Sequence, residues 1–181
     1  MPDGYAGRVD RAEVEATIRA AFAGVRLGSG MSLRQAQAAD TWRDDGHTEA
    51  DWRALPRSEV TDDWSAVPWS ELERDCTAYL DAEGLRYYLP ALMLWLLDHY
   101  DDEHRLFREG ASMALIGTTT TLDQREPYPP GFSELLTPEQ RRAIALYVRA
   151  LPELVELDHD DTARMARAWR DVWSRELADE A

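Results

Sequence analysis

The sequence predicts a mainly α-helical fold, a compact single-domain bundle of at least five helices over residues 1–181 with an ordered core over about residues 10–178. Helix-start signals recur along the chain, and apolar residues repeat at helical spacing after them. The length of 181 residues suits one hydrophobic core. Residues 114–122 contain four consecutive threonines and are compatible with a short extended segment.

Two helices are predicted in the N-terminal part of the chain. The first begins after Asp10 and ends near Ala23. Its apolar face comprises Val14, Ile18, Ala21, Phe22 and Val25. The second begins with a capping box formed by Ser32 and Gln35 and runs to about Trp42.

The following stretch, residues 43–68, is polar and interrupted by glycine and proline. Large apolar side chains in and just after it should fold it back onto the core. They are Trp52, Leu55, Trp64, Val67 and Trp69. A third helix is predicted from a capping box at Ser70 and Glu73 to about Asp81. Its apolar stripe is Leu72, Cys76, Tyr79 and Leu80.

The most apolar segment, Tyr87–Tyr100, predicts the central helix. Gly84 is expected to close the preceding helix in a left-handed conformation, and Pro90 to occupy the first turn of the new one. Because residues on every side of this segment are apolar, we expect it to be buried on most sides.

Two further helices are predicted near the C-terminus. Thr137, Pro138 and Gln140 combine a threonine cap, proline at the first position and glutamine at the third, and Pro152 should end that helix. The last helix covers about residues 162–178. Its apolar face comprises Met165, Trp169, Val172, Trp173 and Leu177.

The net charge of −15 is unevenly distributed along the chain. Residues 40–103 contain 17 acidic residues and 5 arginines. This charge repels phosphate backbones, so we expect no binding to nucleic acid. It suits a basic protein partner or divalent cations; the alternative interpretation is a solvated surface that aids solubility.

Composition also bears on chemistry and location. All 20 basic residues are arginine, so no lysine can form a Schiff base or a P-loop. The single cysteine, Cys76, cannot form an intramolecular disulfide, which favours a cytoplasmic location. The longest apolar run, Leu89–Leu97, is nine residues long. A membrane-spanning helix needs about 20, and we therefore expect a soluble protein.

The segment around residues 80–91 concentrates candidate binding residues: Asp81, Glu83, Arg86, Tyr87 and Tyr88. In a structural interpretation, Arg86 forms an ion pair with Asp81 or Glu83 and keeps a part-buried carboxylate charged. In a functional interpretation, the two carboxylates form a cation site or an acid/base pair, and Arg86 holds an anionic substrate.

This segment resembles the signature of an uncharacterised bacterial family, a domain of unknown function with the core LDAEG-x-R-[FY]-YLPA. Weaker similarity extends to residues 27–28, 32–36 and 136–140, so the resemblance spans most of the chain. That family has no established activity. The resemblance therefore implies a single domain and no particular chemistry.

A second cluster could ligate a metal and consists of Asp98, His99, Asp102, Glu103 and His104. On a continuous helix, Asp98 and Asp102 share one face, as do His99 and Glu103. The two histidines are five positions apart, which departs from the HExxH and HxxEH zinc signatures. Solvated acidic surface is the alternative interpretation.

The function predicted from these observations is non-enzymatic protein binding, as in an immunity-type or adaptor protein. We expect no cofactor and another protein as partner, for which the acidic charge favours a basic one. The alternative is a metal-assisted hydrolase that uses Asp81 and Glu83 or the 98–104 cluster. A third hypothesis is a structural oligomer with an apolar patch on its tryptophan-bearing faces.

Overall fold

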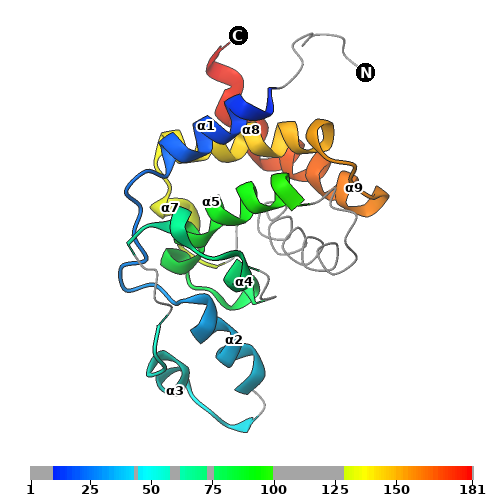
Figure 1. Cartoon of the computed structure of the whole chain (residues 1–181). Helices are drawn as coiled ribbons and strands as arrows, with labels where there is room; N and C mark the ends of the chain where they lie inside the picture. Colours follow the sequence, from blue (N-terminus) through cyan, green and yellow to red (C-terminus); the bar gives the residue numbers. More distant parts are fainter. Residues whose placement is uncertain (1–9, 43–44, 58–61, 73–75, 100–128, 181) are drawn as a thin grey trace.

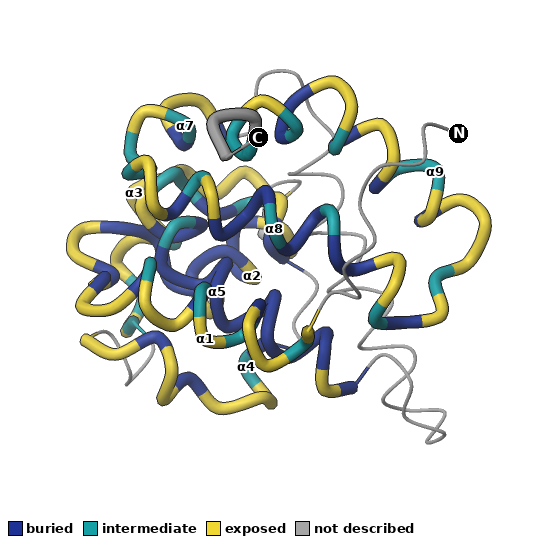
Figure 2. The backbone as a smooth tube through the Cα atoms, turned by 90° about the horizontal axis from the view of Figure 1, so that it is seen from above, coloured by how far each residue is buried: buried dark blue, intermediate teal, exposed yellow. Residues whose placement is uncertain are grey.

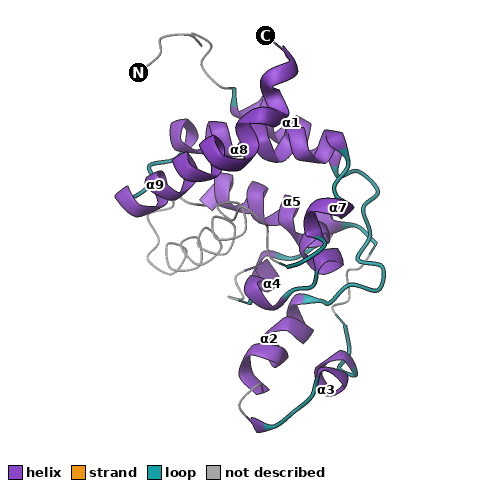
Figure 3. Ribbon diagram, turned by 180° about the vertical axis from the view of Figure 1, so that it is seen from behind, coloured by secondary structure: helices purple, strands orange, loops and turns teal. Residues whose placement is uncertain are grey.

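The computed structural model describes residues 10–42, 45–57, 62–72, 76–99 and 129–180 (Figure 1). Within these ranges all regular structure is helical and no strand occurs (Figure 3). Five helices have ten or more residues, namely α1 (Arg11–Ala21), α2 (Leu33–Trp42), α5 (Ala82–His99), α8 (Pro138–Leu154) and α9 (His159–Ala168). The predicted helical fold class is thus confirmed, while residues 114–122 lie outside the described ranges.

Helix α5 lies at the centre of the molecule, with α1 and α8 above it and α2 with α3 (Glu49–Arg53) below it in Figure 1. Helices α1 and α8 pack along each other, and α5 contacts both of them. Nearly every residue of α5 is buried, as the dark blue tube in Figure 2 shows. Burial on all sides explains why α5 carries no polar face.

The start of α5 corrects the sequence prediction. The helix begins at Ala82, five residues before the predicted start, and both Gly84 and Pro90 lie inside it. Gly84 does not have a positive φ, so it closes no preceding helix. Asp81 provides the start signal instead, because its Oδ1 accepts a hydrogen bond from the Gly84 N–H at 2.8 Å.

The third predicted helix, from Ser70 to Asp81, does not form as a single element. The described parts are α4 (Trp69–Leu72) and a 3₁₀ turn, η3 (Thr77–Tyr79). Cys76 interrupts the helical path with a φ of −142°, and its thiol donates to the Leu33 carbonyl at 3.2 Å. Leu72, Cys76 and Leu80 are nevertheless buried. The apolar spacing thus identified these core residues correctly, but it wrongly predicted that they lie on one continuous helix.

The stretch between α2 and α4 packs onto the core mainly through Trp64 and Val67, which are both buried. Trp64, in the 3₁₀ turn η2 (Trp64–Ala66), donates its indole N–H to the Phe22 carbonyl at 2.8 Å. Trp52 is partly buried against the core. Trp69 is 48% exposed, although its ring meets that of His99 on α5 edge-on at 3.8 Å.

The C-terminal segment continues from α9 through a π-helical turn, η4 (Trp169–Trp173), into a 3₁₀ helix, η5 (Ser174–Glu180). All three elements follow α8 in the chain, and each of them packs against it. This helical run starts three residues before the predicted position, because Asp158 caps α9 by accepting from the Asp161 N–H at 2.8 Å. Pro152 lies inside α8, which ends at Leu154 rather than at the proline.

The described helices include none that is both long and apolar enough to cross a membrane. α5 is the most apolar of the long helices, and it is covered by the other elements of the fold.

Trp95, on α5, provides a test of this core. It is 1% exposed, and its indole N–H finds no acceptor among the described residues. Trp95→Ala should lower the free energy of unfolding by about 3–5 kcal/mol in a denaturant titration. Trp95→Phe should lower it by about half of that or less, because it retains most of the ring and removes an unpaired donor. A loss below about 0.5 kcal/mol for Trp95→Ala would show that α5 is peripheral.

Candidate functional site

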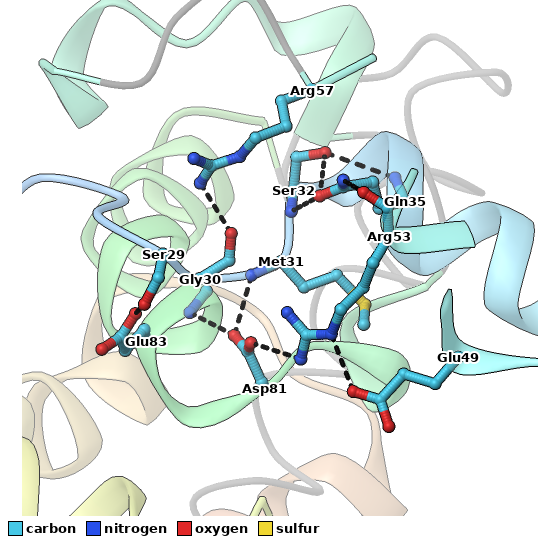
Figure 4. A network of polar contacts seen from close by, with 11 residues as sticks. Ser29, Gly30, Met31, Ser32, Gln35, Glu49, Arg53, Arg57, Asp81 and Glu83 are labelled. Carbon is cyan, nitrogen blue, oxygen red and sulfur yellow. Dashed lines mark hydrogen bonds and ion pairs between the residues drawn. The ribbon is translucent and has the colours of Figure 1, made fainter. Parts of the chain in front are cut away.

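Asp81 joins three segments of the chain at the start of α5 (Figure 4). Its Oδ1 accepts hydrogen bonds from the backbone N–H groups of Gly84, at 2.8 Å, and Met31, at 2.9 Å. Its Oδ2 accepts from Arg53 on α3, at 3.0 Å. This carboxylate is therefore used in holding the loop of residues 27–32 and α3 against the central helix.

The loop lies so close to α5 that the contact requires glycine on both sides. A Cβ added to Gly30 would be 2.6 Å from the backbone nitrogen of Gly84, and one added to Gly84 would overlap the Met31 carbonyl oxygen. The glycine of the LDAEG sequence is thus explained by close approach of two backbones rather than by a turn.

Further polar contacts hold the same loop. Ser29 donates its hydroxyl to the Glu83 carboxylate at 2.6 Å. Arg57 donates to the carbonyl oxygens of Gly28 and Gly30 at 2.8 and 2.6 Å. Gln35 completes the capping box of α2 with Ser32. These contacts show that the Asp81 and Glu83 carboxylates both take part in a structural network.

Gln35 also ties α2 to the segment that follows α3. Its side-chain amide donates to the carbonyl oxygens of Arg53 and Leu55 at 3.0 and 3.2 Å. The residue is only 4% exposed, so these bonds satisfy polar groups away from water.

Arg86 corrects the predicted ion pair. It forms no ion pair with Asp81 or Glu83, and its Nε donates instead to the side-chain oxygen of Gln140 on α8, at 3.2 Å. Asp81 is paired with Arg53, from a part of the sequence that the prediction did not consider. The guanidinium of Arg86 is oriented towards α8, away from the LDAEG network.

Arg86 lines a pocket of about 450 Å³ between the end of α1, α5 and the start of α8. Its polar wall also includes Arg26, Glu139 and Gln140. A second pocket, of about 480 Å³, lies beside the Asp81–Arg53 pair and is bordered by Trp52, Tyr79, Pro129 and Pro130. Two of the candidate residues of the LDAEG segment, Arg86 and Asp81, thus border separate pockets.

Tyr87 and Tyr88 are fully buried, with their rings packed edge to face at 4.8 Å. Burial raises the pKa of Tyr87 well above its usual value. Smaller contributions in the same direction come from the neighbouring Tyr88 and from the carboxylates of Asp63, Asp62 and Glu71. Both tyrosines belong to the core, so a bound ligand would not reach them without rearrangement.

The first two residues of the predicted metal cluster face different surroundings. Asp98 is exposed and accepts a hydrogen bond from Arg11 on α1. His99 is buried between Trp95, on which its ring stacks at 5.1 Å, and Trp69, which it meets edge-on at 3.8 Å. Its Nδ1 lies 2.8 Å from the Trp95 carbonyl oxygen, so a hydrogen bond there requires the Nδ1–H tautomer.

The other members of that cluster, Asp102, Glu103 and His104, lie outside the described residues. Within the described ranges, no group of three histidine, cysteine or carboxylate side chains is arranged to hold a metal ion. The predicted pairs, Asp98 with Asp102 and His99 with Glu103, each include one of these residues and stay predictions.

Sequence reasoning missed the partners that define this site. Arg53, Ser29 and Met31 reach residues 81–84 across 28 to 54 positions of the chain. Gln140 was recognised as the capping residue of α8, but its second contact, with Arg86, carries no local signal. A single sequence offers no periodic pattern from which such long-range pairs can be read.

The comparisons with known proteins give one match. A family model described as a family of unknown function, DUF6714, matches residues 10–177. This confirms the predicted membership of an uncharacterised family, while the LDAEG signature and a bacterial origin stay predictions. No curated protein and no solved structure matches the chain.

Gly84→Ala tests the close contact between the loop and α5. Alanine is the better residue inside an ordinary helix by about 1 kcal/mol, so propensity alone predicts stabilisation. Overlap with the Met31 carbonyl oxygen should reverse the sign and lower the free energy of unfolding by about 1–3 kcal/mol. Chemical denaturation measures the change, and a gain in stability would contradict the described contact.

Proposed function

Since the chain belongs to DUF6714, a family of unknown function, we propose its role from its own geometry: a non-enzymatic, protein-binding module of the immunity or adaptor type that engages a basic partner. The observation that carries the proposal is an excess of uncompensated carboxylates over residues 40–83. The described part of this stretch contains nine acidic residues and two arginines.

Both arginines are already used inside the molecule. Arg53 pairs with Glu49, at 2.7 Å, and with Asp81. Arg57 donates to two backbone carbonyls of the loop that contacts α5. Among the described residues of this stretch, Glu49 and Asp81 are therefore the carboxylates that pair with an arginine, and no further arginine is free to neutralise the others.

Three of these acids, Asp40, Asp45 and Asp62, are exposed and have no ion-pair partner among the described residues. Exposed carboxylates of this kind attract a basic partner over several ångströms and increase its association rate. The arrangement supports partner binding more than hydrolysis, because the Asp81 and Glu83 carboxylates are hydrogen-bonded within the protein.

A charge-matched pair of variants tests this proposal. Asp40→Asn, Asp45→Asn and Asp62→Asn combined should weaken the binding of an arginine-rich peptide by about tenfold, since an exposed ion pair contributes roughly 0.5 kcal/mol. Isothermal titration calorimetry at about 50 and about 200 mM salt measures the affinity and its screening.

The control combines Glu13→Gln, Glu134→Gln and Glu153→Gln, which remove the same charge from exposed positions outside residues 40–83. It should bind the peptide nearly as tightly as the unmodified protein. Equal weakening by both triple variants would mean that only net charge matters and would refute a localised binding surface. We expect the natural partner to be a host protein that binds both the unmodified chain and the control variant. The variant that lacks Asp40, Asp45 and Asp62 should not bind it.

A further inference from the structure

The pocket at the junction of α1, α5 and α8 is positively charged, although the chain as a whole carries −15. Its charged residues are two arginines, Arg26 and Arg86, and one glutamate, Glu139. Its volume of about 450 Å³ falls within the range of small-molecule sites in proteins. Two arginines gathered in one pocket of an acidic protein favour the binding of a small anion there.

The guanidinium of Arg86 has unused hydrogen-bonding capacity. The side chain is half-buried, and its Nε–H donates to Gln140 at 3.2 Å. Its remaining N–H groups have no acceptor among the residues that the structure describes. An arginine carries five such donors in a planar fork. No atom of Arg86 is among the buried, unsatisfied polar atoms of the described residues, so its remaining donors are accessible to a ligand in the pocket.

Gln140 fixes the orientation of that guanidinium. It is 2% exposed, and its side-chain nitrogen donates to the Ala21 carbonyl at 3.2 Å. Its side-chain oxygen accepts from the Thr137 N–H at 3.2 Å as well as from Arg86. Because both the nitrogen and the oxygen of this amide are hydrogen-bonded, Gln140 fixes the side chain of Arg86 at the pocket wall. Arg86 would therefore lose little conformational entropy on binding a ligand.

The acidic residue of the pocket, Glu139, forms no ion pair with Arg86 in the described structure. Hydrogen bonds from the Glu139 backbone N–H and the Thr137 hydroxyl hold the pKa of Glu139 below its usual range. Its carboxylate is thus charged and engaged at the start of α8, where the helix dipole also favours it. Arg26 is exposed and has no hydrogen-bond or ion-pair partner among the described residues.

We propose that this pocket binds a small oxyanion, a carboxylate or phosphate group, through the guanidinium groups of Arg86 and Arg26. A bidentate contact from Arg86 would satisfy the donors that the protein leaves unpaired. None of the acidic residues 40–83 lines this pocket, but Asp62 and Asp63 line an adjoining pocket that shares Ala23, Gly24 and Val25 with it. The proposal rests on the two arginines and does not depend on the protein-binding role proposed above.

Calorimetric titration of the full chain with inorganic phosphate, with succinate and with sodium chloride at equal ionic strength tests the proposal. We expect saturable binding of phosphate or succinate with a dissociation constant of about 1 mM or tighter, and none of chloride. Binding of phosphate alone assigns a phosphate ligand, and binding of succinate alone assigns a carboxylate. If neither oxyanion binds saturably, the proposal is overturned.

Variants locate the binding. Arg86→Lys keeps the charge but loses the planar fork and should weaken binding by about tenfold. Arg26→Gln should weaken it severalfold without affecting folding, because Arg26 makes no hydrogen bond or ion pair in the described structure. Arg34→Gln removes another exposed arginine, on α2, which has no partner among the described residues, and should leave binding unchanged. Equal weakening by Arg26→Gln and Arg34→Gln would contradict the site.

Discussion

The carboxylate of Asp81 is the interaction on which the arrangement of the N-terminal half depends. One oxygen accepts from two backbone N–H groups, those of Met31 and Gly84, and the other accepts from Arg53. It therefore starts the central helix and fixes the 27–32 loop and α3 against it at the same time. Because the side chain is about 30% exposed, these bonds are only partly screened by water. The paired glycines at positions 30 and 84 follow from the same contact, since any side chain there would separate the two backbones.

Two glutamines repeat this principle elsewhere in the fold. Gln35 and Gln140 each complete a capping box, and each uses its amide nitrogen to bind a carbonyl of a distant segment. A helix start thereby becomes a junction between elements. At Gln140 the junction also holds Arg86 beside a pocket, while residues 40–83 present exposed acids. The two surfaces differ in charge, and they come close to each other at Ala23–Val25, where the pocket of Arg86 adjoins one lined by Asp62 and Asp63.

Local signals predicted part of this structure and tertiary contacts decided the rest. The caps at Ser32 and Thr137 were predicted correctly because a capping box is complete within four residues. Gly84 was misassigned because glycine after an apolar stripe is typical of a helix end, whereas here the approach of Met31 requires it. The predicted partner of Arg86 was wrong for a similar reason. The nearby carboxylates suggested an ion pair, whereas the actual acceptor, Gln140, lies 54 positions away. The LDAEG segment was identified as important from sequence, but its structural role follows only from the fold.

The central claim is that Asp81 serves structure, and comparison of Asp81→Ala with Glu83→Ala tests it most directly. Loss of a helix cap and of hydrogen bonds to a charged group should lower the free energy of unfolding by about 2–4 kcal/mol for Asp81→Ala. Within the described part of the chain, the Glu83 side chain makes one exposed hydrogen bond, to Ser29, and its removal should change stability by less than about 1 kcal/mol. Hydrogen exchange at the Met31 amide should accelerate only in the Asp81 variant. Unchanged stability and unchanged exchange in Asp81→Ala would contradict the account and return Asp81 to the candidates for a catalytic or metal-binding role.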